Sequence, residues 1–121
     1  MSRSELGMFG EEQAASLLEK EGYRILERNF RCRFGEIDLI ARRRDILAFV
    51  EVKLRKNASY GEAREFVTPS KQHRLRMTAS WYLSGRLWTQ TLQPRFDVDE
   101  IYAPQGADGP LKLSHLEDAF V

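Results

Sequence analysis

The fold of this chain is decided by the stretch GEIDLIARRRDILAFVEVKLR, which runs from Gly35 to Arg55. Two runs rich in aliphatic and β-branched residues, 35–41 and 46–54, flank the short polar segment 42–45. Apolar runs of this length on either side of a polar turn are typical of two strands joined as a β-hairpin. The stretch therefore predicts an antiparallel pair of strands.

The position of the turn sets which side chains of the hairpin face each other. If the chain turns at residues 44–45, Asp38 lies opposite Glu51, and in the same register Glu36 lies opposite Lys53. Because side chains alternate across a strand, these four charged groups are expected to project from one face. The apolar side chains between them supply the core from the other face, and they are Ile37, Leu39, Val50 and Val52.

Asp38 and Glu51 form an unfavourable pair, because like charges directly opposite one another destabilise a sheet. Two carboxylates about 5 Å apart repel by roughly 3 kcal/mol at an effective dielectric constant of 20. A divalent cation between them would remove this repulsion, and Mg²⁺ takes carboxylate oxygens while it keeps several waters. Such a cation activates water and stabilises charge on a phosphoryl oxygen. The pair therefore indicates an Mg²⁺ or Mn²⁺ site, beside which Lys53 would orient the attacking water or neutralise the transition state.

The same residues also fit an ordinary half-exposed strand, with apolar side chains inward and charged side chains outward. However, Leu47 and Phe49 share the face of Glu51 and Lys53. A fully solvated face has little reason to carry a phenylalanine. We therefore expect a second layer to cover this face, with the charged groups at its edge in a cleft.

Apolar periodicity and terminal signals predict the other elements. Thr68 as the cap and Pro69 at the first helical position begin a second helix that ends before Gly85. The other predicted elements are a helix over 4–21, a strand over 23–30, a loop over 55–68, a strand around 96–101 and a last short strand over 111–116. The order is helix, three strands, helix, strand, which predicts one mixed α/β domain over residues 1–121.

In this context the hairpin resembles the YraN-type family of small bacterial proteins. The resemblance is carried by GEIDLIA at 35–41, FVEVK at 49–53, Gly10-Glu11 with Ala14, residues 22–26 with Asn29, Lys71, Tyr82-Leu83 and residues 95–98. It implies a restriction-endonuclease-like fold, to which the archaeal Holliday-junction resolvases are similar. In the PD-(D/E)XK signature of that superfamily, Asp38 matches the first acid, and Glu51 and Lys53 match the acid-any-lysine part. Ile37 stands where the signature has proline.

The first helix contributes a further acid. Glu11 shares a stripe with Gly7, Ala14 and Leu18 by three- and four-residue spacing, so it is expected to face inward, whereas Glu12 faces solvent. In related resolvases a glutamate of the first helix completes the metal shell, and the resemblance gives that role to Glu11. The alternative is that Glu11 is a solvated helix residue.

Charge is unevenly distributed along the chain. The whole sequence has 19 basic and 18 acidic residues, a net charge of +1, but residues 24–76 hold 14 basic and 7 acidic residues, a net charge of +7. A basic block around the hairpin is expected of a protein that binds a phosphate backbone, although solvated strand and helix faces would also give it. The cations expected to contact nucleic acid are Arg31, Arg33, Arg42, Arg43, Arg44, Arg55, Lys56, Lys71 and Arg74.

Several other classes of protein are excluded. The single cysteine, Cys32, allows no internal disulfide and no multi-cysteine zinc site, and there is no glycine-rich phosphate loop or G-x-S-x-G motif. No apolar run is long enough to span a bilayer and no secretory signal is evident, so we expect a cytoplasmic protein with no membrane partner. Trp81 and Trp88 are assigned to the core or to self-association. His73 and His115 are far apart and are given surface or structural roles.

The resulting hypothesis is a metal-dependent nuclease that hydrolyses phosphodiesters in DNA, including branched or damaged DNA. Asp38, Glu51 and Glu11 would hold Mg²⁺ or Mn²⁺, Lys53 would act on the water, and Glu36 would be an additional ligand or support one. A homodimer is expected by analogy, since the related resolvases act as dimers. Two alternatives remain: a non-catalytic nucleic-acid-binding module, and a protein-interaction domain with a dormant site.

Overall fold

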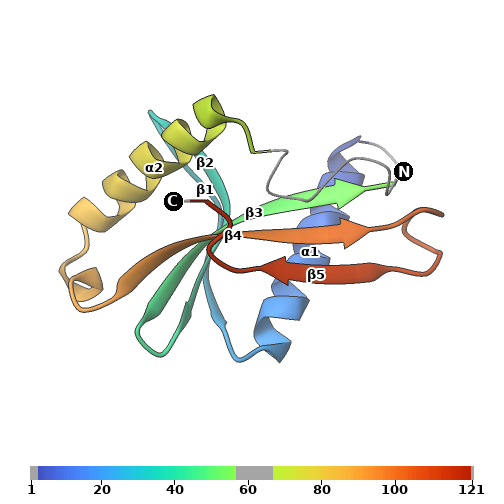
Figure 1. Cartoon of the computed structure of the whole chain (residues 1–121), viewed down its shortest axis with the longest axis horizontal. Coiled ribbons are helices and arrows are strands. Elements are labelled where there is room, and N and C mark those ends of the chain that lie inside the picture. The colour runs from blue at the N-terminus through green and yellow to red at the C-terminus, as the bar shows by residue number, and fades with distance from the viewer. Residues whose placement is uncertain (1–2, 57–66, 121) are drawn as a thin grey trace.

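The computed structural model describes residues 3–56 and 67–120, and within them two long helices pack on a five-stranded sheet (Figure 1). The elements in chain order are α1 (Arg3–Lys20), β1 (Arg24–Cys32), β2 (Gly35–Arg43), β3 (Ile46–Arg55), α2 (Pro69–Ser84), the 3₁₀ turn η2 (Leu87–Thr89), β4 (Gln93–Tyr102) and β5 (Lys112–Leu116). This confirms the predicted mixed α/β class and element order. In the described ranges no helix is both long and apolar enough to cross a membrane.

The sheet follows the chain order, β1-β2-β3-β4-β5. The first three strands form an antiparallel meander, and β5 pairs antiparallel with β4. Only the β3–β4 pair is parallel, over residues 46–55 and 93–102, because a parallel neighbour requires a crossover connection and α2 with η2 supplies it. This connection carries α2 over one face of the sheet, where the strands nearest to it are β2 and β1.

The two helices cover opposite faces of the sheet (Figure 1). On one face, α1 packs through small and aliphatic side chains against β2 and β3; the buried residues of this layer include Ala14, Ala15, Leu18, Leu39, Ala41, Ala48 and Val50. On the other face, α2 buries Leu75, Ala79 and Tyr82 against Leu47 and Phe49. The second layer expected over Leu47 and Phe49 is therefore α2.

The ends of α2 are where the sequence predicts them. The Thr68 hydroxyl accepts a hydrogen bond of 3.2 Å from the backbone N–H of Lys71, and Pro69 occupies the first turn. Gly85 caps the other end. The chain before this helix was predicted to be a loop over residues 55–68, and most of that segment, 57–66, lies outside the described residues.

The strands β2 and β3 separate before their charged ends meet. Their antiparallel ladder pairs residues 39–43 with 46–50, which confirms the predicted register as far as it extends. Beyond Leu39, β2 continues to pair with β1 as far as Gly35, whereas β3 stays paired with β4 along its whole length. The hairpin therefore opens into a fork at Asp38.

The fork corrects several predicted side-chain positions. The expected pairings of Asp38 with Glu51 and of Glu36 with Lys53 both fall outside the ladder, and Glu36 forms an ion pair of 2.8 Å with Arg31 on β1. Ile37 packs in the core under α2, not with Leu39 under α1. The β1–β2 ladder skips the Asn29–Asp38 pair, and Asn29 has a left-handed backbone with a φ of 53°, so the regular alternation of side chains is interrupted at this point.

Candidate metal and nucleic-acid site

The fork brings two predicted acids to one cavity. Asp38 of β2 and Glu51 of β3 line a cavity of about 230 Å³. Glu11 of α1 lines the same cavity, and Gly10 forms part of its wall. A Cβ atom on Gly10 would be 3.7 Å from the Val52 side chain, an ordinary van der Waals contact, so α1 lies close to β3 here. The three predicted metal ligands are thus neighbours in space, although they come from three separate elements.

Asp38 is held in place by the backbone of the opposite strand. Its Oδ2 accepts a hydrogen bond of 2.8 Å from the N–H of Val52. Since Val52 lies just past the end of the β2–β3 ladder, the carboxylate takes the place of a missing backbone acceptor. The fork therefore fixes the orientation of Asp38.

Burial and neighbouring negative charge raise the pKa of the Asp38 carboxyl from 3.8 to about 7. Desolvation is the largest cause, and the charge of Glu51 is the next. The hydrogen bond from Val52 lowers the pKa, whereas the charges of Glu11 and Glu36 raise it further. A cation at this position would offset both the desolvation and the repulsion, so the cavity favours positive charge.

Glu51 is 8% exposed and is contacted from the other face of the sheet. The Lys71 ammonium on α2 forms an ion pair with Glu51 Oε1. The partner of this acid on the α2 side is thus a lysine in the first turn of the helix, where Thr68 and Pro69 set the backbone.

Glu11 is oriented by a residue with unusual backbone geometry. The Asn29 side-chain amide donates a hydrogen bond of 2.9 Å to Glu11 Oε2. Asn29 has a φ of 53°, a left-handed conformation that asparagine tolerates better than most residues. Glu12 points to solvent as predicted and pairs with Arg28 at 2.8 Å. The inward position predicted for Glu11 agrees with the structure.

Lys53 lies two residues beyond Glu51 on β3 and is half-buried. It is next to Glu100 in the parallel β3–β4 register. The α1-facing side chains of this part of β3, Val52 and Leu54, line the acidic cavity. Lys53 therefore projects from the opposite face of the strand and is not among the residues that line this cavity. Side-chain alternation had predicted it on one face with Asp38 and Glu51.

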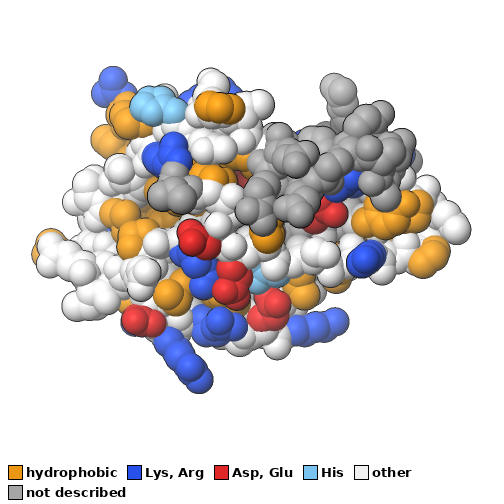
Figure 2. Space-filling view, in the orientation of Figure 1, with side chains coloured by type: hydrophobic (Ala, Val, Ile, Leu, Met, Phe, Trp, Pro, Cys, Tyr) orange, Lys and Arg blue, Asp and Glu red, His pale blue; other side chains and the backbone are white. Residues whose placement is uncertain are grey.

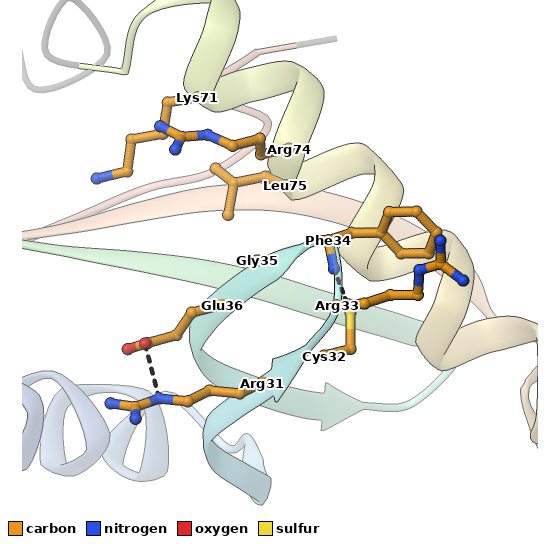
Figure 3. A pocket seen from close by; sticks show the side chains of 9 residues that line it. All are labelled: Arg31, Cys32, Arg33, Phe34, Gly35, Glu36, Lys71, Arg74 and Leu75. Carbon is orange, nitrogen blue, oxygen red and sulfur yellow. Dashed lines mark hydrogen bonds and ion pairs between the residues drawn. The ribbon is translucent and has the colours of Figure 1, made fainter.

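A second and larger cavity, of about 630 Å³, lies between the β1–β2 turn and α2 (Figure 3). Four of the predicted phosphate contacts line it, namely Arg31, Arg33, Lys71 and Arg74. Figure 3 shows Lys71 and Arg74 extending from α2 above the cavity, while Glu36 and Arg31 face them from the strands below. Lys71 lines this basic cavity and also forms the ion pair with Glu51, which lines the acidic cavity. The two cavities are therefore linked by one ion pair.

The other five predicted phosphate contacts lie outside the basic cavity. The Arg43 guanidinium donates to the carbonyl oxygen of Glu21 at 2.9 Å and lies 4.5 Å from the Tyr23 ring centroid, so it secures the start of β1. The Arg55 side chain is 9% exposed and pairs with Glu100 at 2.8 Å, which makes it an internal ion pair. The remaining three are Arg42 and Arg44 near the β2–β3 turn and Lys56 at the end of β3.

The structure also contains a buried charged network that the sequence analysis did not identify. His115 on β5 lies between two carboxylates, with its Nε2 2.7 Å from Asp97 Oδ2 and its Nδ1 2.6 Å from Glu21 Oε1. Arg95 donates two hydrogen bonds of 2.8 Å to the fully buried Asp97. At the rim Arg95 also pairs with the half-exposed Glu117 at 3.5 Å. Figure 2 shows acidic and basic side chains gathered on the face over β4 and β5.

This network shifts the pKa values of its members. Burial alone would lower the pKa of His115, but the hydrogen bond to Asp97, the charge of Asp99 and the hydrogen bond to Glu21 raise it to about 9. Asp99 is fully buried, and neither of its carboxylate oxygens has a hydrogen-bond partner among the described residues. Burial, opposed by the charge of His115, raises the pKa of Asp99 to about 7. His115 thus has the structural role that the sequence allowed for it.

These features define a mixed α/β fold with a carboxylate cavity where two central strands separate and a basic cavity beside it. A family model described as "Uncharacterised protein family UPF0102" matches residues 10–101. The chain belongs to this family, which is the YraN-type family that the hairpin resembles.

Curated relatives extend the match over nearly the whole chain. A UPF0102 protein of Symbiobacterium thermophilum is 48% identical over 120 residues, which cover 99% of this chain and 98% of the relative. A UPF0102 protein of Syntrophomonas wolfei is 44% identical, with 96% and 97% covered, and one of Clostridium perfringens is 45% identical, with 95% and 93% covered. The chain is therefore similar to these proteins from end to end.

Proposed function

We propose that this protein is a metal-dependent nuclease that hydrolyses phosphodiester bonds in DNA. The observation that carries the proposal is that the half-buried Asp38 and the buried Glu51 share a cavity that Glu11 also lines, next to a cavity lined with cations. Two carboxylates in one small cavity are unfavourable unless a cation or a proton accompanies them. The phosphate of a substrate requires cations as well, and the neighbouring basic cavity supplies them.

The donor set fits a hard divalent cation. Mg²⁺ commonly rests on one or two carboxylates and keeps several waters, and Asp38 and Glu51 provide that pair. Within residues 3–56 and 67–120, no three His, Cys, Asp or Glu side chains are grouped so that they could hold a metal ion as they stand. Glu11 would therefore have to move from its hydrogen bond with Asn29 to join the other two acids. When bound, Mg²⁺ or Mn²⁺ would lower the pKa of a water molecule and stabilise charge on a phosphoryl oxygen.

The side chains of the chain supply positioning and charge. Asp38, fixed by the Val52 N–H, keeps one oxygen toward the strand and leaves the other for the cavity. Lys53, beside Glu51 on β3, would orient the attacking water or offset the charge that develops on the phosphoryl oxygens. Lys71 holds Glu51 from the α2 side, and Lys71 and Arg74 line the space where phosphates would lie. Glu36, which pairs with Arg31 at the edge of the same cavity, would support the metal site only after releasing that partner.

A second candidate function is a nucleic-acid-binding module whose site is dormant. The observation that favours it is the Lys71–Glu51 ion pair, since an ammonium ion already neutralises one of the two acids. On this alternative the protein binds DNA in a salt-sensitive manner but cleaves no substrate with any divalent metal.

The test is a cleavage screen over DNA junctions, flaps, nicked duplexes, intact duplexes and single strands, with Mg²⁺ or Mn²⁺. We expect the wild-type protein to cut at least one of these substrates and Asp38→Asn to cut none while remaining folded. Glu12→Gln is the matched control, because Glu12 adjoins Glu11 on the same helix but pairs with Arg28 at the surface. A wild-type protein that leaves every substrate intact with both metals contradicts the proposal. Salt-sensitive binding without cleavage would then support the dormant module, and no binding would support a protein-interaction domain.

A further inference from the structure

The basic cavity ends in an aromatic surface that the proposed function leaves without a role. We propose that this cavity binds a single, unpaired strand of nucleic acid, with phosphates on the cations beside α2 and a base against Phe34 and Trp81. The proposal rests on the proposed function in that both need a nucleic-acid ligand. It goes further by naming the form of that ligand and the residues that select it.

The cationic part of the cavity is open to a polyanion. Lys71 and Arg74 extend from α2, and Arg31 faces them from β1 (Figure 3). The Arg31 side chain is 73% exposed, and its ion pair with Glu36 lies at the surface. Exposed ion pairs contribute little to stability because water screens them, so Arg31 can exchange Glu36 for a phosphate at small cost. Phosphate binding by such cations releases counterions and is the main source of affinity for a nucleic-acid backbone.

The aromatic part consists of Phe34, which lies in the β1–β2 turn and lines the cavity, and Trp81 of α2 beside it. The rings of Phe34 and Trp81 are 6.0 Å apart in an edge-to-face arrangement, and the Arg33 guanidinium is 5.1 Å from the Phe34 ring centroid. Trp81 is 49% exposed and Met77, one turn earlier on α2, is 38% exposed. Trp81 is therefore not the core residue that the sequence analysis allowed for. A half-exposed indole beside a phenyl ring and a guanidinium offers a flat face on which a base can stack.

The combination selects an unpaired strand over a duplex. In a duplex the faces of the bases are covered by their neighbours, so an aromatic side chain at the surface gains little from them. Single-strand binders join a cationic groove to aromatic stacking platforms, because every unpaired base presents a π-face. The volume of about 630 Å³ is that of a pocket for a small ligand such as one or two nucleotides.

Lys71 connects this strand site to the acidic cavity. Its ammonium contacts Glu51 while its side chain lines the basic cavity. A nucleic-acid strand whose phosphates contact Lys71 would therefore lie next to Glu51, which lines the acidic cavity together with Asp38. The expected ligand is a single-stranded end, flap or gap, presented to the acids from the α2 side.

The two tryptophans of the chain make a direct test possible. Trp88 is 46% exposed, close to the value for Trp81, but it packs on Tyr82 with the ring centroids 6.3 Å apart. In Trp88→Phe, Trp81 is the only tryptophan, and in Trp81→Phe only Trp88 remains. We expect a thymidine oligomer, titrated in EDTA, to quench the fluorescence of the first variant strongly and that of the second little. Equal quenching in both variants, or none in the first, overturns the proposal.

Affinity provides the second measurement, by fluorescence anisotropy with labelled single strands and the matching duplex in EDTA. We expect tighter binding of the single strand than of the duplex. Trp81→Leu should weaken single-strand binding about 5- to 150-fold, the range for losing one stacked base, while Trp88→Leu leaves it unchanged. Arg74→Gln should reduce the slope of log affinity against log salt by about 0.7, whereas Lys112→Gln at the exposed start of β5 should not.

The two proposals fail separately. The single-strand site is overturned if the protein binds the duplex more tightly than the single strand, or if Trp81→Leu and Trp88→Leu weaken single-strand binding equally. This holds even if the protein cuts duplex DNA with Mn²⁺. EDTA removes the metal, so these measurements do not depend on catalysis. Binding of the single-stranded oligomer with quenching of Trp81 therefore supports the single-strand site even if no substrate is cut.

Discussion

The Asp38 carboxylate accepts a hydrogen bond from the Val52 backbone across the point where β2 and β3 separate. This contact joins the fold to the candidate site. At the strand fork the Val52 N–H has no backbone acceptor on β2, and the side chain of Asp38 accepts its hydrogen bond instead. The same residue is thus a structural acceptor and a candidate metal ligand, and the two roles can be separated by substitution.

The variants Asp38→Asn and Asp38→Ala should differ in their free energy of unfolding. Asp38→Asn keeps an oxygen that can accept from Val52 and removes a charge from beside Glu51, so we expect no loss of stability without metal. Asp38→Ala leaves the N–H unpaired, which costs about 1–3 kcal/mol for a buried donor. Urea denaturation in EDTA measures both variants. If alanine is as stable as asparagine, the hydrogen bond has no structural role.

Removal of Lys71 should destabilise the protein through Glu51. Lys71→Met leaves a carboxylate that is 8% exposed without its counter-charge on α2. We expect the free energy of unfolding in EDTA to fall by about 1–3 kcal/mol. Glu51→Gln in the same background should restore most of this loss, because the double variant no longer contains the unpaired charge. Additive effects of the two substitutions would show that the ion pair contributes nothing.

Divalent metal should stabilise the wild-type protein. A ligand that binds only the folded state adds about 2.7 kcal/mol at one hundred times its Kd, so we expect Tm to rise by several degrees in millimolar Mn²⁺. Asp38→Asn should abolish the rise and Glu11→Gln should reduce it. Glu12→Gln, the surface neighbour, should behave as the wild-type protein does. An equal rise in all four proteins would place the metal elsewhere.

Local patterns in the sequence were sufficient to predict the hairpin and its acids. The turn at residues 44–45 fixes the register of residues 39–43 with 46–50. The strands separate before Asp38, but Asp38 and Glu51 lie close enough to the end of this ladder to line one cavity. The cap at Thr68 and the stop at Gly85 predicted both ends of α2. These features depend on residues near one another in the sequence, or on one strand pair.

What the sequence did not predict depends on neighbours distant in the chain. The fork arises because β2 follows β1 while β3 follows β4, and it moves Glu36 to Arg31. The burial of Asp97 and Asp99 was missed because acidic residues are exposed by default. A signal was present, since both flank Val98 in a strand that lies between β3 and β5. Only the pairing with β5, however, brings His115 beside them.

The network around His115 should make stability depend on pH. Both raised pKa values mean that the folded state binds more protons than the unfolded chain, so stability falls as pH rises between the two pKa values of each group. For His115 the stabilisation is complete below about pH 6.5 and is lost as pH rises through about 9. For Asp99 the folded state loses stability as pH rises from about 4 to about 7. The groups that face the imidazole are Glu21 after α1 and Asp97 and Asp99 on β4.

We therefore expect the free energy of unfolding in EDTA to fall by about 2–3 kcal/mol between pH 6 and pH 9.5, mainly through His115. Urea denaturation at several pH values measures this slope. His115→Gln should remove most of it, whereas His73→Gln on the exposed face of α2 should leave it in place. Asp99→Asn should reduce the dependence between pH 4 and pH 7, because a neutral amide has no charge to desolvate, and the part that comes from the raised pKa of Asp38 should remain. A slope of the same size in His115→Gln would show that the imidazole is neutral in the folded protein, and that its two carboxylate contacts are held by one donated and one accepted proton.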